Sequence, residues 1–214
     1  MKASLSLYDT LSQLMLGYVW VWALVALSII DESLLSSDKG LMTIPIAFIL
    51  GYFINAISSW GEWILFWTWR GKPSRRLIAG EAPPKFQIPT ILNIQSSLKD
   101  ELKLSGAFKD LTNTELDQAF NYTNSFAKQG ANRIGEFNAA YAFSRGLVFA
   151  FLGAWLTFFS FSFCLDIIPS WISNYSYHLL WVGILIAWYR TKERGYYLSR
   201  ELIYNYAKVK VSQR

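Results

Sequence analysis

The chain has 214 residues, of which 53% are apolar, 17% aromatic and only 16% charged. Soluble proteins carry about 25% charged residues, so this composition is unusual for one. A disulfide scaffold is excluded because Cys164 is the one cysteine, and the placement of the few charges, described next, excludes a single-domain soluble enzyme.

Four runs of the sequence contain no Asp, Glu, Lys or Arg: Thr10–Ile30, Gly40–Gly61, Gly146–Leu165 and Ile167–Tyr189. A helix needs about 20 residues to cross the ~30 Å hydrocarbon layer of a bilayer. We therefore predict an all-α integral membrane protein with four transmembrane helices and helical cytoplasmic extensions. The expected spans are residues 11–30, 41–60, 146–165 and 171–189.

The first apolar run is longer than the 7–15 residues typical of a signal peptide, so we interpret it as a retained span. Basic residues then predict the orientation, because cytoplasmic loops are enriched in Lys and Arg. Residues 70–145 contain 11 of them and the tail from Arg190 contains seven, whereas the 31–39 loop is mainly acidic. We expect a multi-pass protein of the bacterial inner membrane with both termini in the cytoplasm. The basic residues next to the spans are predicted to meet lipid headgroups: Arg70, Lys72, Arg75, Arg76, Arg190, Lys192 and Arg194.

The predicted organisation has four parts: a membrane hairpin (1–69), a cytoplasmic helical segment (70–145), a second membrane hairpin (146–189) and a cytoplasmic tail (190–214). Six Gly and Pro residues predict an irregular segment over 71–89, and a short helix is expected over 91–104. Thr112 and Glu115 have the spacing of a capping box, from which a helix should run into the third span, with a possible break at Gly130. The tail should continue the fourth span and pack between other helices, and a separately folding soluble domain is not expected.

The second span carries a polar stripe, which consists of Gly51, Asn55, Ser58 and Glu62. The +4, +3, +4 spacing puts them on one helix face, which should avoid lipid. Two interpretations remain open: the stripe lines a pore, or it forms a hydrogen-bonded seam with another helix. Glu62 is predicted to pair with Arg145; a ring of Glu62 residues in an oligomer and contact with headgroups are the alternatives.

The third span has a face of small residues, which lets helices approach closely. This face is either packed within one chain or forms a homo-oligomer contact; it consists of Ala142, Gly146, Ala150 and Ala154. His178 is the one histidine, so multi-histidine metal sites and a His-based triad are excluded. We expect no enzyme activity and no cofactor. Nucleic-acid binding is not expected either, because no aromatic–basic motif accompanies the net charge of +5.

Several short motifs carry a resemblance: Tyr8-Asp9 before Gly17, the Leu50–Ser59 stretch, Gly71–Ser74, Ala140–Leu147 and Arg194–Glu201. With these, the chain resembles small four-span bacterial membrane proteins of antiphage systems, such as the membrane subunit of Kiwa or the accessory membrane protein of type VI-B CRISPR loci. It lacks the proline expected beside Gly17 and the histidine expected at Asn55. The resemblance implies a setting in phage defence and no particular site residues.

From these patterns we expect a non-enzymatic, oligomeric membrane protein that acts as a pore-like effector or membrane sensor. The alternative is a membrane scaffold that tethers a cytoplasmic partner protein. The partners we expect are the lipid bilayer, further copies of the chain and a cytoplasmic protein.

Overall fold

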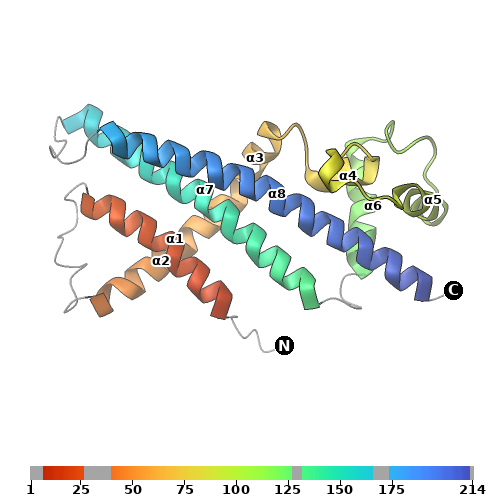
Figure 1. The fold of residues 1–214 in the computed structure, drawn as a ribbon, viewed down its shortest axis with the longest axis horizontal. Coiled ribbons are helices and arrows are strands. Elements are labelled where there is room, and N and C mark those ends of the chain that lie inside the picture. Colours follow the sequence, from red (N-terminus) through yellow and green to blue (C-terminus); the bar gives the residue numbers. More distant parts are fainter. Residues whose placement is uncertain (1–6, 27–39, 127–131, 166–173, 213–214) are drawn as a thin grey trace. The chain divides into compact units, whose positions relative to one another are not determined.

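The structure is a computed structural model that describes residues 7–26, 40–126, 132–165 and 174–212. Within these residues the chain forms eight α-helices and a 3-10 turn, with no strand, which confirms the predicted all-α class (Figure 1). The 31–39 loop, Gly130, Asp166 and Trp171 lie outside the described residues.

The chain divides into two compact units. Unit 1 is Met1–Glu62 with Ala142–Thr191, and unit 2 is Trp63–Tyr141 with Lys192–Arg214. Helices α7 (Asn132–Leu165) and α8 (Asn174–Ser212) contribute residues to both units. They have 34 and 39 residues, which corresponds to helix lengths of about 51 and 58 Å. Residues 190–212 are helical, as predicted, and belong to the same helix as the preceding residues from Asn174 on; the cytoplasmic position of this tail stays a prediction.

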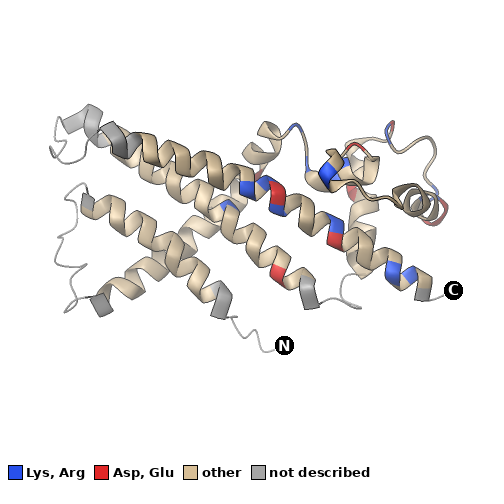
Figure 2. Ribbon diagram, viewed as in Figure 1, with Lys and Arg blue, Asp and Glu red and all other residues tan. Residues whose placement is uncertain are grey.

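Unit 1 also contains α1 (Leu7–Ala26) and α2 (Gly40–Trp60), which pack along each other. Its charged residues with described side chains are Glu62, Arg145 and Arg190. Figure 2 shows that α2 carries no charge and that the described charges gather on residues of unit 2. Large apolar side chains of α1, α2, α7 and α8 are exposed on this unit, among them Met15, Met42, Tyr52, Phe53, Phe159 and Leu185.

Two helices in the described residues are long and apolar enough to cross a membrane, Met42–Trp60 and Ile134–Ser160. These stretches contain most of the second and third predicted spans. The apolar stretch described in α1, Thr10–Val25, is shorter than a span. The four-span interpretation is therefore supported in part, for two of its four helices.

Unit 2 has a hydrophobic core of its own. Its helices are α3 (Glu62–Thr68, which begins at the last residue of unit 1), α4 (Pro73–Ala79), α5 (Ile91–Leu102) and α6 (Asn113–Ser125). The α8 tail completes the core, because Tyr196, Ile203 and Tyr206 are all at most 1% exposed. Phe86 stacks on Tyr196 with ring centroids 4.7 Å apart.

The predicted irregular segment over 71–89 is wrong in part, because α4 and the 3-10 turn η2 (Pro84–Phe86) lie within it. Pro73 stands at the start of α4, where its missing N–H costs no helical hydrogen bond. Gly80 ends α4 with φ +79°, a conformation that favours glycine. Proline and glycine therefore mark the ends of a short helix here.

The predicted capping box is confirmed: the Thr112 hydroxyl accepts from the Glu115 N–H, and the Glu115 carboxylate accepts from the Thr112 N–H. Helix α6 nevertheless ends at Ser125, and α7 begins at Asn132. The break predicted as a possibility at Gly130 falls between these two helices, outside the described residues, and α7 itself continues into the third predicted span.

Gly195 of α8 has no side chain, so Pro73 and Tyr141 can pack directly against the helix at this point. An added Cβ would lie 3.2 Å from each of them.

Candidate functional site: the polar seam of unit 1

The first residue of the polar stripe, Gly51, lies against the backbone of α1. A Cβ on Gly51 would be 1.8 Å from the Gln13 carbonyl oxygen, and one on Gly17 would be 1.6 Å from the Ala47 carbonyl oxygen. Only glycine allows two helix backbones to approach this closely. Gly51 is therefore a packing residue of the α1–α2 contact.

The other end of the stripe meets α7 through Arg145. The Arg145 Nη1 lies 3.1 Å from the Glu62 Oε1, and its Nε donates to the Ser58 Oγ at 3.3 Å. Ser58 is fully buried, and its hydroxyl donates to the Asn55 carbonyl at 2.7 Å. The Arg145 and Glu62 side chains are 12% and 27% exposed. The predicted ion pair is thus present, and both of its charged groups come from one chain.

Asn55 lies about one helical turn after Gly51 in α2. Its Oδ1 is buried without a hydrogen-bond partner in the described residues, as is the Oε1 of Gln13 in α1. Gln13 was not predicted as a site residue. The signal in the sequence is its i, i+4 spacing to Gly17, which places both on one face of α1.

The face of small residues on α7 also packs within the chain. A Cβ on Gly146 would lie 2.5 Å from Leu16, and the Trp20 Nε1 donates to the Ala150 carbonyl at 3.1 Å. Ala154 is fully buried in a cluster with Ala23, whereas Ala142, at the start of this face, is half-buried. Of the two interpretations left open, the geometry favours packing against α1 over a contact between copies.

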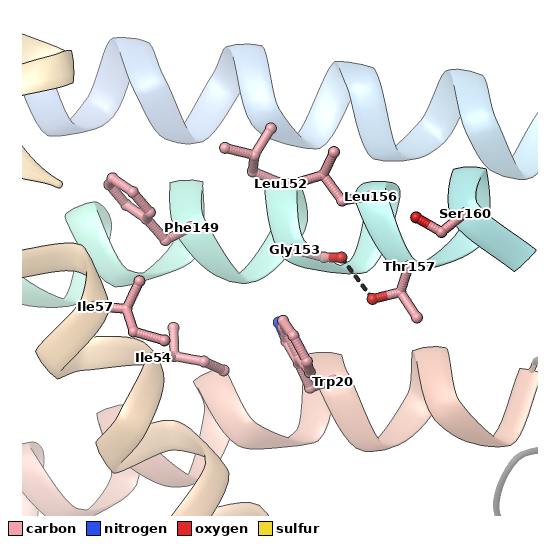
Figure 3. A pocket seen from close by; sticks show the side chains of 9 residues that line it. All are labelled: Trp20, Ile54, Ile57, Phe149, Leu152, Gly153, Leu156, Thr157 and Ser160. Atoms are coloured by element: carbon pink, nitrogen blue, oxygen red, sulfur yellow. Dashed lines mark hydrogen bonds between the residues drawn. The ribbon is translucent and has the colours of Figure 1, made fainter.

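A groove of about 470 Å³ opens in unit 1 where α1, α2 and α7 meet (Figure 3). The Trp20 ring borders it and fits against Gly153, where an added Cβ would lie 2.3 Å from the ring. Only Thr157 and Ser160 bring hydroxyls, and Thr157 donates to the Gly153 carbonyl at 2.8 Å. The lining has no acid or base and suits a hydrocarbon chain; it consists of Trp20, Ile54, Ile57, Phe149, Leu152, Gly153, Leu156, Thr157 and Ser160.

Several predicted headgroup cations of unit 2 make contacts inside the protein. The Arg75 Nη2 and Nε lie 2.6 and 2.7 Å from the Asp117 carboxylate oxygens, and the Lys72 Nζ lies 3.4 Å away. The hydrogen bond from Arg75 lowers the pKa of Asp117 and raises the pKa of Arg75. Arg76 donates to the Glu81 carbonyl at 3.1 Å. These three residues therefore help to hold α4 in place, beyond any role at a membrane surface.

The remaining predicted headgroup cations differ in exposure. Arg70 and Arg190 are exposed, while Lys192 and Arg194 are half-buried. Arg70 has a positive φ of 59° at the turn after α3. The first two positions therefore fit the predicted contact with headgroups better than the other two.

Two further ion pairs join α8 to the rest of unit 2, and neither was predicted from the sequence. The Lys85 Nζ lies 2.5 Å from the Glu193 Oε1, with the Glu193 side chain 8% exposed. The Lys210 Nζ lies 2.5 Å from the Glu101 Oε1, and the Tyr206 hydroxyl donates to the same carboxylate. Burial opposes ionisation of Glu101, but hydrogen bonds from Lys210, Tyr122 and Tyr206 lower its pKa overall. Pairs separated by about a hundred residues have no signal in a single sequence.

Among the residues that the structure describes, no three His, Cys, Asp or Glu side chains are grouped as metal ligands. Comparison with known proteins finds no family model, curated protein or solved structure that matches this chain.

Proposed function

We propose that the chain is a non-enzymatic membrane scaffold, in which unit 1 lies in the bilayer and unit 2 presents a helical surface to a cytoplasmic partner protein. The observation that carries this proposal is the use of the polar stripe inside one chain. Gly51 packs on α1, and Ser58 and Glu62 bind Arg145. A stripe whose residues contact α1 at one end and α7 at the other leaves no continuous polar face for a solute path.

The exposed surface of unit 1 supports the membrane placement. Soluble proteins rarely expose contiguous apolar patches larger than a few hundred Å². Here Tyr52, Phe53 and Ile57 on α2 are 51–60% exposed, and α8 adds Leu179, Leu185 and Ile186 at 60–70%. Lipid tails would cover these side chains. With the distribution of Lys and Arg, four spans in a bacterial inner membrane and two cytoplasmic termini are the topology that we propose.

Unit 2 supports the scaffold role because it has its own core and three internal ion-pair connections. A rigid unit with a fixed surface is suited to binding another protein. The resemblance to antiphage membrane proteins supplies the setting we propose for such binding, which is phage defence.

The topology is tested by labelling single cysteines in inverted inner-membrane vesicles, starting from a C164S variant. Leu92→Cys and Val211→Cys, on exposed positions of unit 2, should react with a membrane-impermeant maleimide. Tyr52→Cys, on the exposed face of α2, should react only after the membrane is dissolved. Equal labelling of all three sites in intact vesicles would exclude this placement.

A pore-like role is the second candidate, and one observation favours it. The Gln13 Oε1 and Asn55 Oδ1 are buried without hydrogen-bond partners in the described residues, and buried polar atoms of this kind are often satisfied by water. Water along this seam would be the start of a path. Asn55→Leu should abolish ion flux if the path exists and should leave a scaffold functional.

A further inference from the structure

Helix α3 exposes large apolar side chains, a type that a helix usually buries against the rest of the protein. Trp63, Ile64 and Trp67 are 68%, 40% and 78% exposed, whereas Leu65 and Trp69 are 3% and 1% exposed. The two exposed tryptophans are four residues apart and so share one side of the helix. The sequence places three tryptophans within residues 63–69. In the structure Trp69 is buried, whereas Trp63 and Trp67 are exposed.

The position of α3 along the chain restricts what can cover this side. The candidate span Met42–Trp60 ends three residues before Trp63, and only Gly61 separates α2 from α3. Three residues extend at most about 11 Å. If α2 crosses the bilayer, α3 must begin within the headgroup layer or at its edge, where tryptophan is enriched.

The charge beside α3 fits an anionic surface. Arg70 directly follows Trp69 and is exposed, and its side chain has no ion pair in the described part of unit 2. The nearby Lys72 and Arg75, by contrast, share Asp117. Arg70 is therefore the member of the basic group 70–76 with the most freedom to reach a phosphate. Lys and Arg next to a membrane are attracted to anionic lipid headgroups.

We infer that α3 is an interfacial helix that binds the surface of an anionic bilayer, with Trp63, Ile64 and Trp67 at the level between headgroups and acyl chains and Arg70 at the lipid phosphates. Leu65 of α3 and Trp69 in the turn that follows the helix are buried in the protein. This inference rests on the proposed membrane placement of unit 1. It gives α3 a binding role, because the helix holds the start of unit 2 at the membrane surface.

The depth of α3 is measured on the full chain, reconstituted in vesicles of zwitterionic lipid with or without phosphatidylglycerol. Single spin labels are introduced at Ile64, Trp67, Leu92 and Tyr52 in the C164S background, and collisions with oxygen and with a water-soluble nickel chelate are compared. Leu92 is the matched control, because it is an apolar residue of unit 2 that is 74% exposed but lies on α5. Circular dichroism checks that each variant keeps its helix content.

The labels at positions 64 and 67 should show an oxygen-to-nickel ratio several-fold above that of the label at position 92. Phosphatidylglycerol should raise this ratio further, and Arg70→Gln should remove that increase. If the labels at 64 and 67 resemble the one at 92 while the label at 52 is oxygen-accessible, the inference about α3 is wrong and the membrane placement stands. If the label at 52 is also accessible to nickel, the proposed membrane placement itself fails.

Discussion

Arg145 of α7 binds Glu62, the first residue of α3, with 3.1 Å between the Nη1 and Oε1 atoms, and also donates to the buried hydroxyl of Ser58 in α2. The Arg145 guanidinium thereby donates hydrogen bonds to two residues of the polar stripe, Ser58 and Glu62. Without it, these two side chains would need water or a second chain as a partner. In an apolar bundle an unpaired charge is expensive, so this contact determines how α2 and α7 fit together.

The ion pair predicts strong coupling between its two residues. Arg145→Met removes the ion-pair partner Arg145 from the partly buried carboxylate of Glu62. We expect a loss of about 1–3 kcal/mol in unfolding free energy, typical of hydrogen bonds to charged groups. Glu62→Gln should cost less, and the double variant should recover part of the Arg145→Met loss. The measurement is a double-mutant cycle from unfolding in mixed micelles. Additive effects would mean that the two side chains do not interact.

The close contact of α1 and α2 predicts that Gly51 cannot be enlarged. An added methyl group meets the Gln13 backbone at 1.8 Å, and backbone atoms cannot rotate away. Gly51→Ala should therefore lower stability by roughly 1–3 kcal/mol, as overpacking does. Gly135→Ala is the control, since Gly135 is helical with nothing within 4 Å. This control should raise stability by about 0.5–1 kcal/mol, and equal effects of the two substitutions would contradict the packing.

Much of this arrangement was predictable from local patterns, and the rest was not. The charge-free runs and the +4, +3, +4 spacing of the stripe predict the helices and the shared face, and the depths of Glu62 and Arg145 predict their pairing. Whether the polar face of α2 meets lipid, water or another helix depends on where α7 packs. The periodicity of a single sequence has no information about that packing. The contact of Gly51 with Gln13 requires the crossing point of two helices. Asp117 with Arg75, and Glu193 with Lys85, join segments 42 and 108 residues apart.

The Asp117 contact predicts a pH dependence of unit 2. The hydrogen bond from Arg75 lowers the pKa of Asp117 below its ordinary value of 3.8. A carboxylate with a lowered pKa in the folded state stabilises the fold above its unfolded pKa, and this contribution is lost as the pH falls through the folded pKa. Asp117→Asn should therefore reduce the melting temperature at pH 7, and the difference from wild type should shrink below pH 3.8. A difference that stays constant from pH 7 to pH 3 would be inconsistent with this contact.

Lys85 is predicted to matter more than an ordinary surface lysine. Its Nζ neutralises Glu193, whose side chain is 8% exposed, and it also lies over the Phe86 ring at 5.5 Å from the centroid. Lys85→Met should destabilise the protein by about 1–3 kcal/mol, because it leaves a buried acceptor without this donor. Lys99→Met, on an exposed position of α5, should stay within about 0.5 kcal/mol of wild type. Urea unfolding followed by tryptophan fluorescence compares the two; similar losses would argue against a special role for Lys85.

Ion flux tests the central claim, that the polar stripe is sealed inside one chain. Purified protein is reconstituted into liposomes that contain a potassium gradient and a potential-sensitive dye, with empty liposomes and gramicidin-treated liposomes as the two references. Because Gly51 packs on α1 and Ser58 and Glu62 bind Arg145 of α7, the potassium flux of the protein liposomes should equal that of the empty ones. A potassium flux well above that of empty liposomes, which Asn55→Leu abolishes, would contradict the account and establish the stripe as a path.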